Sequence, residues 1–388
     1  MHDPRDPIAA ATASNPYAIY AAVVAEAPIA RDPASGMWVA AGAQAVSAIL
    51  GDQRCRVRPP GEPVPTALAG SPVGDVFRHL VRMTDGAVHA PLKRSVSAAL
   101  ASIDERDLAR TSERWARELW DANDLDRFIF ALPSYVIADL LGIPDGLLPR
   151  SADLLGRFVR CLAPGNSPKE IEQGNRATRE LCGMMHALLD EPDAPPTPNL
   201  FLALAREARR EGIEDAGVIV ANAIGFLVQA HDATAGLIGN TLLALASRPE
   251  LRAHARVGPD MLNAVIASVA RENPSVQNTR RYVAEEGIIA GAHMQVGDAI
   301  LVLLAAANHD PAGVADPGQP GGADCNRPGF SFGAGVHACP GAALALTIAR
   351  AGIEHIIADE AGDWQWPRVI AYRPSRNARI PRFTEEEW

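Results

Sequence analysis

The stretch that decides the fold is Phe330-Ser331-Phe332-Gly333-Ala334-Gly335-Val336-His337-Ala338-Cys339-Pro340-Gly341. A helical pattern follows it over 342–357. Gly333 and Gly335 permit backbone conformations that other residues avoid, so the chain can bend tightly and pass close to a flat, bulky group. Cys339 lies just before the helix, where N–H groups and the positive end of the helix dipole lower the pKa of a thiol. The stretch therefore predicts a stabilised thiolate in a tight bend.

A thiolate held by N–H donors in an apolar setting is suited to be an axial ligand of haem iron, because these donors tune the electron density on sulfur. His337 lies two residues before Cys339, within reach of a haem propionate. An isolated cysteine in a glycine-rich turn is more often a buried, inert thiol. The complete spacing F-G-x-G-x-H-x-C-x-G favours the haem ligand instead.

This run resembles the haem-binding loop of the cytochrome P450 superfamily. The matching positions are Phe332, Gly333, Gly335, His337, Cys339 and Gly341. The resemblance extends in order over essentially the whole chain. It implies a mainly α fold with small β-sheets, the cytochrome P450 fold, in which one triangular helical domain over residues 1–388 encloses haem b (iron protoporphyrin IX) with Cys339 as the iron ligand.

Three cationic residues are the expected partners of the haem propionates. His89 and Lys93 lie in a segment that resembles the family pattern H-x-x-x-R, with lysine in place of arginine, and Arg281 resembles a further propionate partner. Surface solvation is the ordinary state of such side chains. Their order along the chain favours the propionate role. Residues 307–311, which read A-N-H-D-P, resemble the family's A-N-R-D-P, and residues 372–374 resemble the start of its C-terminal hairpin.

The long apolar segment over 215–247 departs from the family at its midpoint. The family reads about A-G-x-[D/E]-T-T there, and the acid with the first threonine relays protons; here Asp232 keeps the acid and Ala233 replaces that threonine. Alanine has no hydroxyl with which to donate a hydrogen bond or hold a water. Thr234 should point elsewhere, since neighbouring helix residues lie about 100° apart. His231 is either a packed or hydrogen-bonded histidine or a second axial ligand.

A second departure lies in the segment expected to carry the buried E-x-x-R ion pair. Ser268 stands where glutamate is expected, whereas Arg271 is kept. A serine hydroxyl can accept a hydrogen bond from a guanidinium but cannot neutralise its charge. Arg327 is a candidate third member of this network, and Asp324 or Glu272 is a candidate source of the missing charge.

These features predict a haem-thiolate oxidoreductase that performs monooxygenation or oxidative coupling of a small hydrophobic molecule in specialised metabolism. Its protons would then come from a substrate hydroxyl or an ordered water. The alternatives are a peroxide-driven or isomerising haem enzyme and a P450-like haem-binding protein without turnover. The resemblance places substrate contacts at apolar positions of several segments, namely Phe77, Leu80, Val81, Ile224, Leu227, Ala230, Val276, Asn278 and Ala378.

Charge, the N-terminal segment and the cysteine count exclude several classes of partner, location and bound group. The formal net charge of -10 argues against nucleic acid, which needs a strong basic surface. No basic n-region precedes an apolar run at the N-terminus, and His231 and Asp232 interrupt the long apolar segment where charge is most costly in lipid, so we expect a cytoplasmic protein without a membrane span. Five scattered cysteines disfavour both a disulfide framework and a structural metal site.

No flavin or nicotinamide fingerprint is visible, so electrons should come from a ferredoxin and its NAD(P)H-dependent reductase. We expect a monomer or weak dimer. An acidic ferredoxin would require a basic patch near Cys339. The candidates for that patch are Arg78, Arg82, Lys93, Arg94 and Arg350.

Apolar periodicity predicts a mostly helical chain. The helices are expected at 75–81, 87–101, 109–119, 134–141, 177–189, 200–210, 215–247, 262–271 and 342–357. Short strands are expected at 37–40, near 280–284 and at 299–304, and loops at 59–72, 191–198 and 311–322, where proline and glycine cluster.

Overall fold

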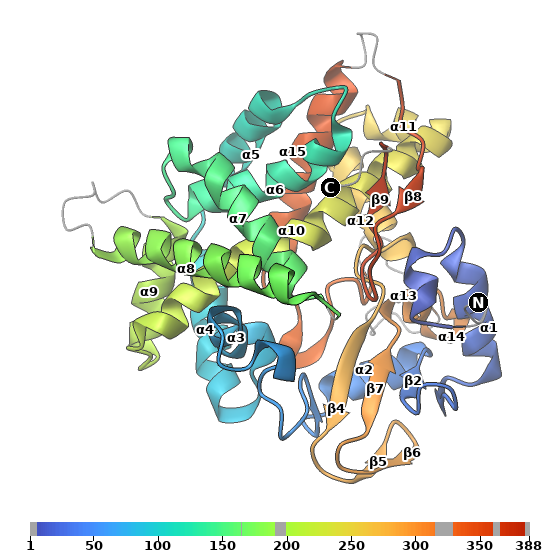
Figure 1. Cartoon of the computed structure of the whole chain (residues 1–388). Coiled ribbons are helices and arrows are strands. Elements are labelled where there is room, and N and C mark those ends of the chain that lie inside the picture. The colour runs from blue at the N-terminus through green and yellow to red at the C-terminus, as the bar shows by residue number, and fades with distance from the viewer. Residues whose placement is uncertain (1–5, 164, 191–198, 315–328, 360–364, 385–388) are drawn as a thin grey trace. The chain divides into compact units, whose positions relative to one another are not determined.

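The computed structural model describes residues 6–163, 165–190, 199–314, 329–359 and 365–384 (Figure 1). Helices dominate, and the strands form one five-stranded sheet and two hairpins among these residues. The predicted fold class, mainly α with small β-sheets, is confirmed.

The chain divides into two compact units, each assembled from separated segments. The first unit comprises Met1–Pro60, Leu119–Phe130 and Asp232–Trp388, and the second comprises Gly61–Glu118 and Ala131–His231. Cys339 and Arg281 belong to the first unit, whereas His89 and Lys93 belong to the second. The expectation of a single domain over 1–388 remains a prediction.

A small mixed sheet organises the first unit. Its strand order is β1 (Ile29–Arg31), β2 (Trp38–Ala40), β7 (Ala299–Val302), β4 (Thr279–Val283) and β3 (Cys55–Arg56). Strands β2 and β7 run parallel and the other pairs antiparallel, with Arg281 opposite Ile300. Figure 1 shows β4 and β7 side by side. Two hairpins complete the strands, β5 (Gly287–Ile289) with β6 (Ala292–Met294) and β8 (Ala371–Tyr372) with β9 (Pro381–Arg382).

Helices of the first unit pack against this sheet and against one another. They are α1 (Pro16–Glu26), α2 (Ala43–Gly51), α11 (Pro249–Ala255), α12 (Pro259–Glu272), α13 (Leu304–Asn308), α14 (Pro311–Val314) and α15 (Ala342–Asp359). One apolar core joins α2 to the sheet and includes Phe330, which is fully buried. Burial of that side chain anchors the chain at the entry of the cysteine loop.

The second unit is helical. It contains α3 (Pro72–His79), α4 (Gly86–Ala101), α7 (Leu148–Cys161), α8 (Pro168–Asp190), α9 (Leu200–Arg210) and most of α5 (Glu105–Leu119). Polar caps start two of these helices: the Ser71 hydroxyl accepts from the Gly74 amide, and the Asn199 side chain accepts from the Leu202 amide. Helices α7 and α8 approach closely because Gly174 lies over Cys161, where a Cβ would come within 2.4 Å of the cysteine Cβ.

Two helices contribute to both units, α6 (Leu125–Leu140) and α10 (Ala216–Ser247). By length and composition α10 is the one helix among the described residues that is long and apolar enough to cross a bilayer. Residues 219–228 and 234–240 of this helix are buried in protein. Only its middle, residues 229–233, is half-buried or exposed within that stretch.

Most of the predicted helices are confirmed with shifted ends. The periodicity located 200–210 to the residue, but α6 begins nine residues before the predicted 134 and α8 nine before the predicted 177. Leu80 and Val81, predicted inside a helix, follow the end of α3. The short helices α1, α2, α7, α11 and α13 were missed, and α14 lies in a predicted loop whose remainder is outside the described residues, as is 191–198.

Candidate functional site

The loop before α15 presents the Cys339 side chain at an exposed position. Backbone hydrogen bonds fold the loop back on itself, because the Cys339 amide donates to the Phe332 carbonyl at 2.8 Å and the Gly333 amide donates to the Phe330 carbonyl at 2.8 Å. The α15 helix begins at Ala342, three residues after the cysteine. The thiol therefore stands at the start of a helix on a closed, ordered turn.

Both predicted glycines of the bend stand where a side chain would be unfavourable. Gly333 has φ +68° and Gly335 has φ +67°, in the left-handed region that favours glycine. A Cβ on Gly335 would lie 2.3 Å from the Leu50 carbonyl oxygen at the end of α2. This close approach fixes the loop against α2. An exposed soft thiolate donor on such a preformed loop fits the axial position of a haem iron.

Two expected propionate partners share the first unit with Cys339. Arg281 on β4 is 5% exposed, and its Nη1 donates to the Thr279 hydroxyl at 3.3 Å and the Arg280 carbonyl at 2.9 Å. His337 is half-buried in the 3-10 turn Gly335–His337 of the loop itself. A guanidinium presents several N–H donors and is chemically suited to a carboxylate such as a propionate. The donor set therefore fits haem.

The other two expected partners lie in the second unit, one turn apart on α4. His89 is 5% exposed; its Nδ1 lies 3.1 Å from the Val81 carbonyl oxygen and 3.4 Å from the Thr84 hydroxyl. A proton on Nδ1 can be donated to that carbonyl. Lys93 is half-buried on the same helix. Residues at i and i+4 share a helix face, so both cations are presented together.

Asn308 holds the entry to the cysteine loop, a role that sequence reasoning did not assign. Its side chain accepts from the Phe330 amide at 2.7 Å and donates to the Ser331 hydroxyl at 2.9 Å and the Arg271 carbonyl at 3.0 Å. The Ser331 hydroxyl in turn donates to the Ala270 carbonyl. These bonds fasten the start of the loop to the end of α12. The A-N-H-D-P resemblance marked the residue but not its contacts.

Asp310 of the same motif joins two helix N-termini. Its carboxylate accepts from the Ala43 amide at 2.8 Å, at the first turn of α2, and from the Ala312 amide at 3.0 Å in α14. A carboxylate favours the positive end of a helix dipole, so Asp310 stabilises the position of α2. Since α2 supports Gly335, the motif positions the cysteine loop from two sides.

At the middle of α10, exposure changes within one turn. Asp232 and Ala233 are half-buried, whereas Thr234 is 1% exposed. The expectation that Thr234 points away from its neighbours agrees with this burial. His231 is held by the Ser134 hydroxyl of α6, which lies 3.1 Å from its Nδ1. This contact corresponds to the hydrogen-bonded state expected for His231.

The predicted substrate contacts separate by burial. Leu80, Val81, Ile224 and Leu227 are at most 5% exposed and pack inside the second unit; a Cβ on Gly225 would lie 3.1 Å from a Leu80 methyl group. Phe77 and Ala230 are half-buried. In this structure the four buried residues serve as core.

In the first unit, Val276 and Ala378 pair in a β-bridge, so two predicted substrate segments lie side by side. Asn278 is 3% exposed, and its side-chain amide donates to the Arg376 carbonyl at 2.9 Å. The half-buried Val276 is the most accessible of these three positions.

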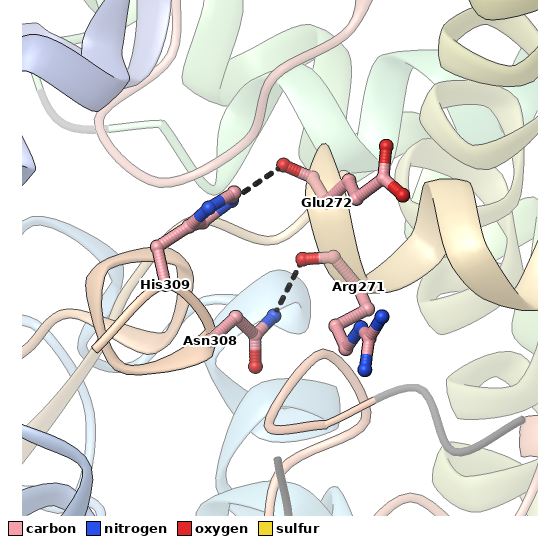
Figure 2. Close-up of a pocket in the computed structure, with 4 residues that line it drawn as sticks. All are labelled: Arg271, Glu272, Asn308 and His309. Atoms are coloured by element: carbon pink, nitrogen blue, oxygen red, sulfur yellow. Dashed lines mark hydrogen bonds between the residues drawn. The ribbon is translucent and has the colours of Figure 1, made fainter. Parts of the chain in front are cut away.

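Ser268, which stands where the E-x-x-R pattern has glutamate, makes a contact that the sequence did not predict. The Ser268 hydroxyl donates to Glu272 Oε1 at 2.6 Å, and Arg248 Nη1 lies 2.9 Å from Glu272 Oε2. The serine is therefore engaged with Glu272 rather than with Arg271. Figure 2 shows the Arg271 guanidinium and the Glu272 carboxylate pointing in different directions. Arg327 and Asp324 lie outside the described residues.

Three of the expected basic docking residues already have acidic partners. Arg94 makes a two-pronged ion pair with Glu211, Arg78 contacts Asp75 at 2.7 Å, and Arg350 contacts Glu354 at 3.2 Å. Arg82 is exposed and Lys93 is half-buried. The positive field of the proposed patch is thus smaller than the residue types alone suggested.

The remaining described cysteines behave as ordinary thiols. Cys55 and Cys161 are buried and Cys182 is half-buried. Burial raises the pKa of Cys55 to about 12 and raises the pKa values of Cys161 and Cys182 as well. Cys325 lies outside the described residues. Among the four described cysteines, Cys339 is the exposed one.

No family model matches the chain. The biotin biosynthesis cytochrome P450 of Bacillus subtilis (strain 168) is 24% identical over 385 residues, which cover 95% of this chain and 96% of that protein. The 6-deoxyerythronolide B hydroxylase of Saccharopolyspora erythraea is 28% identical over 346 residues, or 85% of this chain and 84% of that one. The crystal structure of CalO2 aligns with a TM-score of 0.81 at 24% identity, covering 98% and 96% of the two chains, and shows the same fold.

Proposed function

Because this chain belongs to the cytochrome P450 superfamily of haem-thiolate oxidoreductases, we propose that it binds haem b through Cys339 and oxidises a small hydrophobic molecule. The observation that carries the proposal is the exposed Cys339 on a closed loop at the start of α15. Haem b, when bound, supplies the redox-active iron at which dioxygen is reduced. We further propose one P450 domain over residues 1–388.

Four cationic residues serve to hold the cofactor in this proposal. Arg281, His337, His89 and Lys93 would hold its propionates, as the family resemblance implies. Phe332, Gly333 and Gly341 complete the cofactor-binding loop. Charge-assisted hydrogen bonds to carboxylates are about twice as strong as neutral ones, which suits a non-covalent cofactor.

Asp232 is the proposed proton donor of the active site. The half-buried Ala233 beside it offers no hydroxyl, and Thr234 is packed inside the protein. A water or a substrate hydroxyl therefore has to bridge Asp232 to the reacting oxygen. We propose that substrate binding orders this bridge, so that proton delivery depends on the substrate present.

The substrate class and the partners are inferred from the relatives. Several have names that point to biosynthetic oxidation, including the hydroxylase above and the cytochrome P450 monooxygenase PikC of Streptomyces venezuelae. We propose a small lipophilic substrate of specialised metabolism, a cytoplasmic location, a monomer or weak dimer, and electron supply from a ferredoxin with its NAD(P)H-dependent reductase. The ferredoxin patch is proposed at Arg78, Arg82, Lys93, Arg94 and Arg350.

Carbon monoxide binding to the reduced protein tests the iron ligand. Thiolate ligation gives a Soret maximum at about 450 nm. Cys339→Ser should lose this band, whereas Cys182→Ser, which changes a half-buried thiol, should keep it. A wild-type maximum far from that wavelength would refute the ligand assignment.

Substrate-dependent NADPH consumption with a surrogate ferredoxin system tests turnover. Ala233→Thr restores the hydroxyl at the relay position, so we expect less uncoupled peroxide in the presence of a poor substrate. Unchanged coupling with every substrate would contradict the substituted relay.

Ala233 also favours a second candidate, a haem enzyme driven by peroxide or catalysing isomerisation, because such reactions do not need the threonine relay. Product formation with hydrogen peroxide alone, at a rate above that with NADPH and ferredoxin, would support this function. Spectral binding of ligands without product under either condition would indicate a haem-binding protein without turnover.

A further inference from the structure

A cavity of about 240 Å³ lies behind the cysteine loop, between the end of α12 and α13. It is lined by Arg271, Glu272, Asn308 and His309, all within the first unit (Figure 2). Three of these side chains carry N–H donors. In Figure 2 the Glu272 carboxylate points away from the Asn308 and His309 side chains, so its negative charge is directed away from these two lining residues.

The charge of Glu272 is already balanced outside the cavity. Arg248 forms an ion pair with one carboxylate oxygen at 2.9 Å, and the Ser268 hydroxyl donates to the other at 2.6 Å. Burial raises the pKa of Glu272, but the hydrogen bonds from Ser268 and Arg248 and the positive charges of Arg248 and Arg271 outweigh it and hold the pKa below its usual range, so the group is ionised.

Arg271 has no hydrogen-bonded acid in the part of the chain that the structure describes. No ion pair or side-chain hydrogen bond joins its guanidinium to any residue in that part, although the side chain is half-buried. The nearby charge of Glu272 attracts the guanidinium, but both carboxylate oxygens of Glu272 are engaged by Ser268 and Arg248. The serine at position 268 explains this difference, since a glutamate there would share a helix face with Arg271 at a spacing of three residues. The cavity therefore contains a guanidinium whose charge is shared with no carboxylate through a hydrogen bond among the described residues.

The other walls of the cavity are fixed in place. His309 Nε2 lies 2.8 Å from the Glu272 carbonyl oxygen, and its ring packs on Tyr17 with centroids 4.7 Å apart. The Asn308 side chain is held by its three hydrogen bonds to the loop and α12. A preformed cavity loses little conformational entropy when it binds a ligand.

We propose that this cavity binds a small oxyanion, such as inorganic phosphate or a short carboxylate, with the Arg271 guanidinium as its main contact. The bound anion takes the place of the carboxylate that Ser268 removes. A planar guanidinium presents paired N–H donors that match two oxygens of such an anion. The cavity also leaves room for waters that hydrogen-bond to the anion.

Anion binding here would stabilise the support of the cysteine loop. The Arg271 carbonyl accepts from Asn308, which holds Phe330 and Ser331 at the entry of that loop. A bound anion adds to the attraction from Glu272 and lowers the cost of a half-buried guanidinium that has no hydrogen-bonded carboxylate among the described residues. The proposal is independent of which substrate the protein oxidises.

Thermal unfolding of the haem-loaded protein, followed by circular dichroism, tests the site. Inorganic phosphate is titrated up to about 20 mM while sodium chloride keeps the ionic strength constant, so that binding is separated from general screening. We expect the midpoint to rise by about 2 °C and then to saturate. A flat response, or one that rises linearly without saturation, would overturn the proposal.

Ser268→Glu is the decisive variant, because it supplies an internal carboxylate to Arg271. It should abolish the phosphate response, whereas the midpoint in phosphate-free buffer also reflects the lost hydrogen bond to Glu272 and the new charge beside it. Asn263→Glu adds the same charge at an exposed position of α12 and should keep the wild-type response. If Ser268→Glu and wild type respond equally, the anion binds elsewhere and the proposal fails.

A calorimetric titration of phosphate keeps the inference testable if Ser268→Glu does not fold. Wild-type protein should show one saturable site, and His309→Gln, which changes an exposed wall residue, should bind several-fold more weakly. Absence of saturable heat in the wild type would refute the site without any variant.

Discussion

Replacing Gly335 by alanine tests how the cysteine loop is supported. Gly335 has φ +67°, and a Cβ there would lie 2.3 Å from the Leu50 carbonyl oxygen. Gly36 is a matched control, since it has φ +72° but a Cβ added there would meet nothing within 4 Å. The two substitutions share the backbone strain and differ in the collision with α2.

The expected cost follows from these two terms. A left-handed conformation costs an alanine about 1–2 kcal/mol, which is the whole effect expected for Gly36→Ala. For Gly335→Ala, the obstacle is backbone and cannot rotate aside, so forced repacking adds about 1–3 kcal/mol. We expect about 3–4 kcal/mol in total for Gly335→Ala.

Thermal unfolding and the carbon monoxide spectrum provide the assay. At about 1.2 °C per kcal/mol for a chain of 388 residues, the midpoint should fall by about 4–5 °C for Gly335→Ala and by about 1–2 °C for Gly36→Ala. Only Gly335→Ala should also reduce the absorbance at about 450 nm, because its loop carries Cys339. Equal midpoints for the two variants, or an intact thiolate band in Gly335→Ala, would refute the proposed support by α2.

Three further substitutions and conditions have defined outcomes. Asn308→Ala should lower the free energy of unfolding by about 3 kcal/mol, because it leaves buried groups without their partners, and chemical denaturation measures the loss. Ala290→Asn should raise it by about 0.5 kcal/mol, since Ala290 has φ +48° in a hairpin turn before a glycine, and a lower value would contradict the strain. Burial raises the pKa of Glu272, but Ser268 and Arg248 lower it further, so the folded pKa lies below the unfolded value of about 4.3. The stabilising contribution of Glu272 should therefore be complete above the unfolded pKa and be lost as the pH falls through the folded pKa. In pH-dependent unfolding, Glu272→Gln should reduce this loss of stability at acidic pH.

The tight bend at the cysteine loop was predictable from the sequence because its determinants are local. Glycines at fixed spacing, a cysteine and the start of a helix are all set within a dozen residues, and the structure closes that loop with a hydrogen bond from the Cys339 amide to the Phe332 carbonyl. The periodicity of 200–210 and of the long α10 helix was equally readable, since each has a continuous apolar face or core.

Short helices and helix ends were less predictable. Helix α2 is buried along one side and is capped by Asp310 from a segment far along the chain, which no local pattern records. Helix α6 begins well before its predicted start, and its residue Asp126 is fully buried, accepting from the amides of Phe383 and Thr384.

The sequence by itself determined that Cys339 is a thiolate candidate, that Ala233 lacks a hydroxyl and that Ser268 lacks a charge, because residue identity decides which bonds a side chain can make. Only the tertiary structure decided what those residues contact. Ser268 donates to Glu272, which is committed to Arg248, while Leu80, Ile224 and Leu227 pack in the core. The physical reason is that burial and hydrogen-bond partners depend on residues that are distant in sequence and meet only when the chain folds.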